Sequence, residues 1–149
     1  MLEQAKLRAI ESRCTQESPP RCSNACPLGM DVRGFCIHLM QDRPREARKL
    51  LERHIPLPGI VCAVCDHPCE DACLRRDLGG SLAVSSLEKL VLREVGQQTR
   101  PLVRPPKPIR LAVLGAGLAG LVAASDIASK GYSVTVYHEG EMADALNRA

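Results

Sequence analysis

The segment Cys62-Ala-Val-Cys65-Asp-His-Pro-Cys69-Glu-Asp-Ala-Cys73 decides what this chain folds around, together with an earlier cluster, Cys14-x7-Cys22-x3-Cys26-Pro27. Cys36 lies between the two clusters, and no cysteine follows Cys73, so that all eight thiols fall in the first half of the chain. Cysteines gathered at such spacings are typical of a metal site, whereas inert core thiols would be scattered.

Composition and the N-terminal residues indicate the cellular environment in which these thiols are expected. The chain has no run of 18 apolar residues, which predicts no transmembrane helix. Its first residues, Met-Leu-Glu-Gln-Ala-Lys, lack the apolar core of a secretory signal, so we expect a cytoplasmic protein with reduced thiols and no disulfides. The net charge of +3 is mild and its basic residues are interspersed with acidic ones, which argues against a nucleic-acid partner.

Two metals suit the spacing of the cysteines. Iron–sulfur clusters take four thiolates per [4Fe–4S] cube, and the Cys26-Pro27 ending of the first cluster is typical of two-cluster ferredoxins. Zinc takes two closely spaced pairs of ligands, which the segment from Cys62 to Cys73 alone provides. The spacing favours iron–sulfur and leaves both metals open.

Periodicity predicts helices in the first hundred residues. The expected helices cover residues 2–13, a segment capped by Asp31, a segment capped by Asp42 with Pro44 in its first turn, and residues 81–97. Residues 14–27 are expected as a loop. Cys36 falls on an apolar helix face with Val32, Phe35, Leu39 and Met40, so we interpret it as a small buried hydrophobe. His67 is expected at the surface.

A proline-rich linker, residues 99–108, separates residues 1–98 from a second predicted domain, residues 109–149. That domain begins with a strand, residues 109–114, followed by the turn Gly115-Ala-Gly117-Leu-Ala-Gly120, a helix to Lys130 and a strand at 133–137. Glycines at this spacing between strand and helix are typical of a dinucleotide site, with Glu139 placed to bind the ribose hydroxyls. We expect only the first βαβ unit of a Rossmann-type domain here, an incomplete flavin site.

The segments Glu11-Ser-Arg-Cys14, Cys22-Ser-Asn-Ala-Cys26-Pro-Leu-Gly and Val61-Cys62 to Cys73 resemble the N-terminal module of one family. That family comprises the glutamate synthase small subunit, dihydropyrimidine dehydrogenase and related NAD(P)H-dependent flavoproteins, and the resemblance covers roughly residues 8–140. It implies a mainly α fold, an α-helical two-cluster ferredoxin-like domain followed by an FAD-binding Rossmann domain. It also implies one or two [4Fe–4S] clusters, and FAD as the nucleotide.

The resemblance implies a ligand set that crosses between the two cysteine segments. The first cube would use Cys14, position 17, Cys22 and Cys73, and the second Cys26, Cys65, Cys69 and Glu88, a position that is Gln or Glu in relatives. Position 17 is Glu here, and the spacing from Cys62 to Cys65 is one residue short, so either Glu17 or Cys62 completes the first cube, or that cube is altered or missing. We interpret Cys62 as a non-ligand. Ser85-Ser-Leu-Glu88 also matches a capping box, which would occupy Glu88 differently.

By this resemblance the chain is an iron–sulfur electron-transfer module or subunit of an NAD(P)H-linked flavin oxidoreductase, relaying electrons between a flavin and the redox centre of a partner subunit. It would not be catalytically complete alone. Two alternatives stay open: a non-catalytic assembly or electron-relay subunit without bound flavin, and a zinc-stabilised interaction module.

Overall fold

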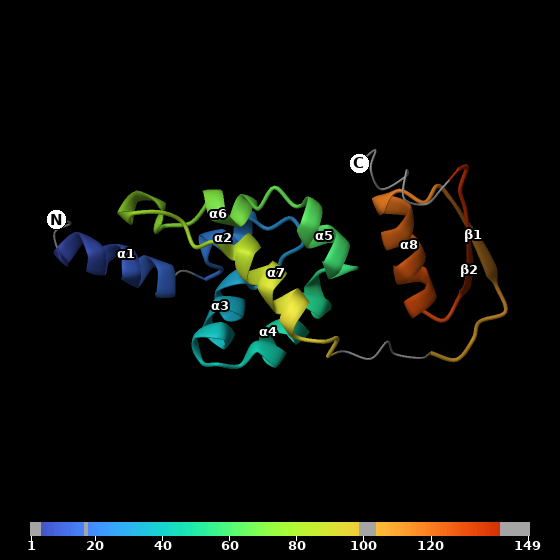
Figure 1. Ribbon diagram of the computed structural model, residues 1–149, viewed down its shortest axis with the longest axis horizontal. Coiled ribbons are helices and arrows are strands. Elements are labelled where there is room, and N and C mark those ends of the chain that lie inside the picture. Colours follow the sequence, from blue (N-terminus) through green and yellow to red (C-terminus); the bar gives the residue numbers. More distant parts are fainter. Residues whose placement is uncertain (1–3, 17, 99–103, 141–149) are drawn as a thin grey trace. The chain divides into compact units, whose positions relative to one another are not determined.

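The computed structural model describes residues 4–16, 18–98 and 104–140 (Figure 1). The chain divides into two compact units, residues 1–98 and 99–149, which are treated separately below. The first unit holds α1 (Gln4–Gln16), α2 (Arg21–Ala25), α3 (Val32–Met40), α4 (Pro44–His54), α5 (Pro58–Val64), α6 (Pro68–Asp71), a 3₁₀ turn (Arg76–Leu78) and α7 (Val84–Glu94). In the second, β1 (Arg110–Leu114) and β2 (Ser133–Tyr137) flank α8 (Leu118–Ser129). This confirms the predicted mainly α fold with a small parallel sheet.

The helix starts follow local sequence signals. Asp31 caps α3 as predicted, because its Oδ1 accepts a hydrogen bond of 2.8 Å from the amide of Gly34. Pro44 begins α4, and Pro58 and Pro68 begin α5 and α6, at the position where a missing amide hydrogen costs nothing.

Other predicted boundaries were wrong. Cys14 lies inside α1 and Cys22 inside α2, where loops were expected. Asp42 does not cap α4: the N-cap is Arg43, and Asp42 has a positive φ of 54°. The short helix α5, which carries Cys62, was not predicted, because the prolines around it read as a helix end.

The core of the first unit is aliphatic around a single phenylalanine. Phe35 and Leu51 are fully buried, and Val91 on α7 is 2% exposed. Met40, expected on the same inner face of α3, is 86% exposed instead, because it ends the helix. The remaining members of the buried cluster are Met30, Val32, Ala47, Ile55, Cys62, Cys69 and Val84.

Polar contacts fix α7, the helix that carries Glu88. Its first turn is capped by a residue distant in the sequence: Glu70 Oε1 of α6 accepts a hydrogen bond of 2.7 Å from the amide of Ser85. Beyond its other end, both carboxylate oxygens of Glu52 accept from the amide of Gln98 at 3.1 Å. The helix is therefore held at both ends by side chains from other elements.

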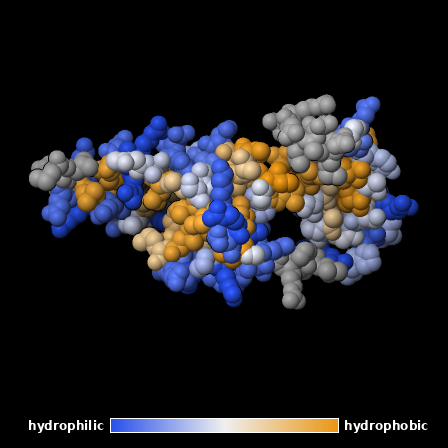
Figure 2. Space-filling model, viewed as in Figure 1, coloured by the Kyte–Doolittle hydropathy of each residue, from blue (hydrophilic) through white to orange (hydrophobic). Residues whose placement is uncertain are grey.

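The second unit is one parallel strand pair with a helix between the strands. β1 and β2 pair from Arg110 opposite Ser133 to Leu114 opposite Tyr137. The segment before β1 contacts the loop between α8 and β2. The amide of Lys107 donates to the carbonyl oxygen of Gly131 at 2.9 Å, and the Lys107 ammonium lies 4.1 Å from the centre of the Tyr132 ring. Apolar side chains reach the surface of this unit (Figure 2), among them Leu114, which is 83% exposed.

All eight cysteines are free in this structure. In the part of the chain that the structure describes, no helix combines the length and the apolar character needed to cross a membrane.

We predict that Phe35→Ala lowers the free energy of unfolding of the first unit by about 3–5 kcal/mol, because the ring is fully buried and its removal leaves a cavity. Ile37→Ala on the same helix is the control and should cost far less, since Ile37 is 42% exposed. Denaturant unfolding followed by circular dichroism measures both, and equal losses would contradict the packing described.

Candidate functional site

The first unit contains a cavity of about 270 Å³ lined by thiols from both cysteine segments. Cys14 comes from the last turn of α1 and Cys22 from the first turn of α2. Cys36 comes from the middle of α3, and Cys73 from the residues after α6. With Cys69 from α6, five thiols thus line one cavity, although 59 positions separate Cys14 from Cys73 in the sequence.

Hydrogen bonds hold the walls of this cavity in place. Arg33 Nη1 donates to the carbonyls of Cys14 at 3.1 Å and Thr15 at 2.9 Å, so that it satisfies the end of α1 and ties it to α3. Ser23 Oγ accepts a hydrogen bond of 3.0 Å from the amide of Val32, which joins α2 to the start of α3. The thiols therefore sit on helices whose mutual positions are fixed by polar contacts.

A second cavity has a volume of about 30 Å³ and begins at Cys26, the C-cap of α2. Its walls include the thiols of Cys26, Cys62, Cys65 and Cys69 and the carboxylate of Glu88. Cys69 also lines the first cavity. Cys22 and Cys26 belong to one short helix and its C-cap, and each lines a different cavity.

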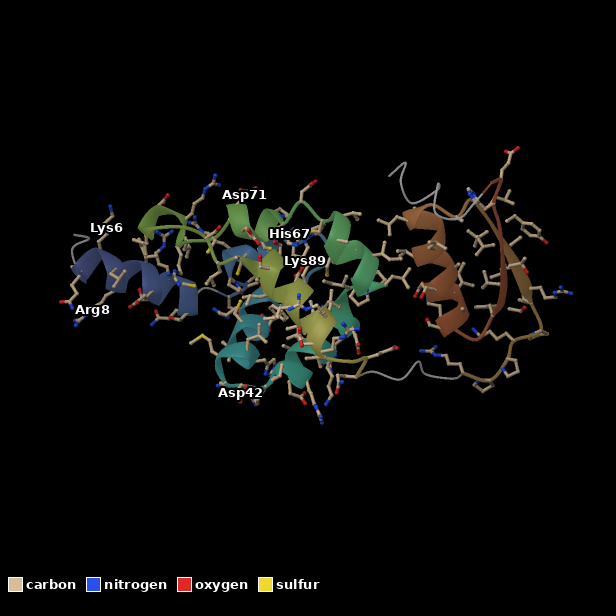
Figure 3. The ribbon with its side chains drawn as sticks, viewed as in Figure 1. Lys6, Arg8, Asp42, His67, Asp71 and Lys89 are labelled. Carbon is tan, nitrogen blue, oxygen red and sulfur yellow. The ribbon has the colours of Figure 1, made fainter. Side chains whose placement is uncertain are left out.

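Glu88 is a buried carboxylate with a defined partner. It is 4% exposed, and its Oε2 lies 3.2 Å from Nε2 of His67. Figure 3 shows His67 against α7, which corrects the expectation of a surface residue, since its side chain is only 11% exposed. The capping-box interpretation of Glu88 was also wrong: α7 begins at Val84, its N-cap is Ala83, and no side chain caps it locally.

The loop of the second cysteine segment is shaped around Cys65. His67 has a positive φ of 53°, an uncommon conformation for a residue with a side chain, and its amide donates to Cys65 Sγ at 3.3 Å. The same residue therefore contacts Cys65 through its backbone and Glu88 through its ring.

Burial sets the proton affinity of the thiols. It raises the pKa of Cys36 to about 11, with further increases from Cys22, Cys73 and Cys14. It raises the pKa of Cys62 and of Cys69 to about 12, and Glu88 is the next cause in both cases. These thiols are therefore protonated at neutral pH unless a metal displaces the protons, so metal binding must release them.

The donors fit iron–sulfur chemistry. Thiols dominate both cavities, and thiolates are the ligands that iron–sulfur clusters take. Within residues 4–16, 18–98 and 104–140, no three Cys, His, Asp or Glu side chains converge closely enough to hold one metal ion. A cube spreads its four ligands over four irons, so they need not converge on one point.

Every site residue predicted in the first unit lines at least one of the two cavities. The first cavity is lined by Cys14, Cys22 and Cys73, and the second by Cys26, Cys65 and Glu88. Cys69 lines both. The ligand set itself stays a prediction, and Glu17 lies outside the described residues. Sequence reasoning missed the burial of His67, whose partner Glu88 is distant in the sequence. Cys36 packs against the core as expected, but sequence reasoning did not place it at the first cavity.

The glycine turn of the second unit lets the strand and the helix approach each other closely. Gly115 has φ of 100°, a conformation that favours glycine, and Gly117 is the N-cap of α8. A Cβ at Gly120 would overlap the carbonyl oxygen of Gly115, so helix and strand approach too closely for a side chain. Gly115, Tyr137 and Glu139 line one open crevice at the carboxyl ends of both strands. The predicted nucleotide residues thus lie at one edge of the sheet, and their role stays a prediction.

Comparison with known families gives two matches. Residues 2–100 match the family described as dihydropyrimidine dehydrogenase domain II, 4Fe-4S cluster. Residues 113–142 match the NAD(P)-binding Rossmann-like domain.

Three relatives illustrate the likeness to whole proteins. The NADPH-Fe(3+) oxidoreductase subunit beta of Geobacter sulfurreducens is 29% identical over 121 residues, which is 78% of this chain and 18% of that protein. The NADP(+)-dependent formate dehydrogenase subunit beta of Moorella thermoacetica is 29% identical over 140 residues, 78% of this chain and 20% of the relative. The glutamate synthase [NADPH] small chain of Mycobacterium tuberculosis is 28% identical over 145 residues, which is 95% of this chain and 30% of that protein. The chain therefore spans less than a third of the length of each of these relatives.

We predict that Gly120→Ala loosens the glycine turn by about 1–3 kcal/mol, because the added methyl group would overlap the backbone of Gly115. Amide hydrogen exchange should show faster exchange throughout α8. Ala119→Ser is the matched control, since its side chain is exposed on the same helix. Unchanged exchange in Gly120→Ala would contradict the close approach.

Proposed function

Since this chain belongs to the dihydropyrimidine dehydrogenase domain II family of 4Fe–4S proteins, we propose that it is an electron-transfer module of an NADPH-linked oxidoreductase. The observation that carries the proposal is the pair of thiol-lined cavities, with Cys22 of α2 in one and its C-cap Cys26 in the other. A bound [4Fe–4S] cluster exchanges single electrons with its neighbours. Two such sites on one short helix are suited to passing electrons across the domain.

The role of the protein residues is to hold and tune the clusters. Cys14, Cys22 and Cys73 would hold the first, and Cys26, Cys65, Cys69 and Glu88 the second. Hydrogen bonds to cluster sulfurs tune the reduction potential, and the amide of His67 already donates to Cys65 Sγ.

His67 has a second task in this proposal, to orient the carboxylate. Its ring nitrogen lies 3.2 Å from Glu88 Oε2, a contact that would hold the carboxylate in position for the metal. Outer partners of this kind hold ligands in position in metal sites.

The second unit would supply the nucleotide end of the relay, and we propose FAD as its nucleotide. The unpaired amides at the start of α8 would face the pyrophosphate, and Glu139 would bind the ribose hydroxyls. Within residues 104–140, β1, α8 and β2 form one βαβ unit, which supplies the pyrophosphate and ribose contacts of such a site but not a pocket for the flavin ring. The named relatives, described as beta subunits and a small chain, support a role within a larger oxidoreductase complex.

The direct test is the iron, sulfide, zinc and flavin content of protein purified without air. We expect about eight irons and eight sulfides per chain, four for each cube. A broad absorbance band that bleaches on reduction with dithionite should accompany them. Zinc without iron would overturn the electron-transfer function.

The role of Glu88 gives a sharper test by substitution. We predict that Glu88→Ala lowers the iron content by about half, because the second cube loses one of its four ligands. Glu88→Gln should keep the iron, since the amide oxygen offers the same donor at the same place. Lys89→Ala, at the exposed neighbouring position of α7, is the control and should retain all of it. Full iron content in Glu88→Ala would exclude Glu88 as a ligand.

A further inference from the structure

The first cavity has one ligand too few by the family pattern. Cys14, Cys22 and Cys73 line it, but a cube takes four ligands. The fourth family position, 17, is occupied by Glu in this chain. The other substitute suggested by the sequence, Cys62, lines the second cavity and contacts Glu88 there. Cys62 therefore has the wrong position to complete the first cube.

Two further thiols line the first cavity, those of Cys69 and Cys36. Cys69 also lines the second cavity, where it is assigned to the second cube, so Cys36 is the thiol that remains. Cys36 lies on α3 and lines the same space as Cys14, Cys22 and Cys73. We propose that Cys36 is the fourth ligand of the first [4Fe–4S] cluster and takes the place of the thiolate that position 17 lacks. The inference rests on the proposed function, since it requires that the domain binds clusters.

The position of Cys36 is held by structure on both sides. Asp31 caps the start of α3, and Phe35, the preceding residue, is fully buried in the core. A thiol on a fixed helix needs no loop rearrangement to stay at the cavity wall. It also matches the soft thiolate donors that the other three positions provide, whereas a carboxylate is a harder ligand.

The charges around the cavity suit a cluster with four thiolates. Such a cluster carries a net negative charge, because four thiolates outweigh the charge of the oxidised core. Three arginines, Arg21, Arg33 and Arg75, line the same cavity. Arg33 is held there by its bonds to the carbonyls of Cys14 and Thr15, so a positive charge is fixed beside the proposed ligands.

The experiment compares iron and sulfide content and the electron paramagnetic resonance signal of anaerobically reconstituted full-length chains. Wild type should hold about eight irons, and Cys36→Ala about half as many, with the dithionite-reduced signal falling from about two spins per chain to about one. Cys62→Ala is the matched control: it removes a buried thiol from the other cavity and should keep the wild-type iron content.

Rescue separates lost ligation from lost folding. Glu17→Cys restores the cysteine of the family pattern, so the double variant Glu17→Cys/Cys36→Ala should regain about eight irons. Full iron in Cys36→Ala would overturn the inference, as would a double variant that stays at the level of Cys36→Ala. Wild type with only four irons, unchanged in Cys36→Ala, would also overturn it while leaving the electron-transfer function standing. Wild type with no iron would instead overturn the proposed function itself.

Discussion

The packing of α2 between α3 and α6 is the contact on which the candidate cluster sites depend. α2 carries one thiol of the first cysteine segment and ends at another, while α6 carries Cys69 from the second segment. Neither segment alone lines either of the two thiol-lined cavities. Because the two segments are distant in the sequence, the cavities exist only once the helical core has formed, so cluster binding and folding are coupled in this unit.

The buried carboxylate of Glu88 is the chief polar feature of an otherwise aliphatic core. An ionised group in such surroundings is costly unless it has partners, and His67 supplies one. A functional role would explain why the carboxylate is buried despite this cost. Metal ligation beside Cys65 and Cys69, as proposed above, is such a role. Leucine at this position would pack more favourably, which is why a purely structural role explains Glu88 poorly.

Sequence patterns predicted the elements whose signals are local. The Asp31 cap, the strand–glycine–helix turn and the separation of cysteines into two groups all follow from short-range rules. The errors arose where distant residues decide. The first turn of α7 is capped by Glu70, fifteen positions before Ser85, and His67 is buried because Glu88 faces it. No window of neighbouring residues contains that information.

The short helix α2 also fixes the distance between two thiols. Cys22 and Cys26 lie four positions apart, which is about 6 Å along a helix axis at 1.5 Å per residue. Each added residue would turn the chain by about 100° and move one thiol out of its cavity. Length changes between these two cysteines should therefore be tolerated far less than substitutions there, and the exposed side chain of Asn24 between them is the place for a label that leaves the spacing intact.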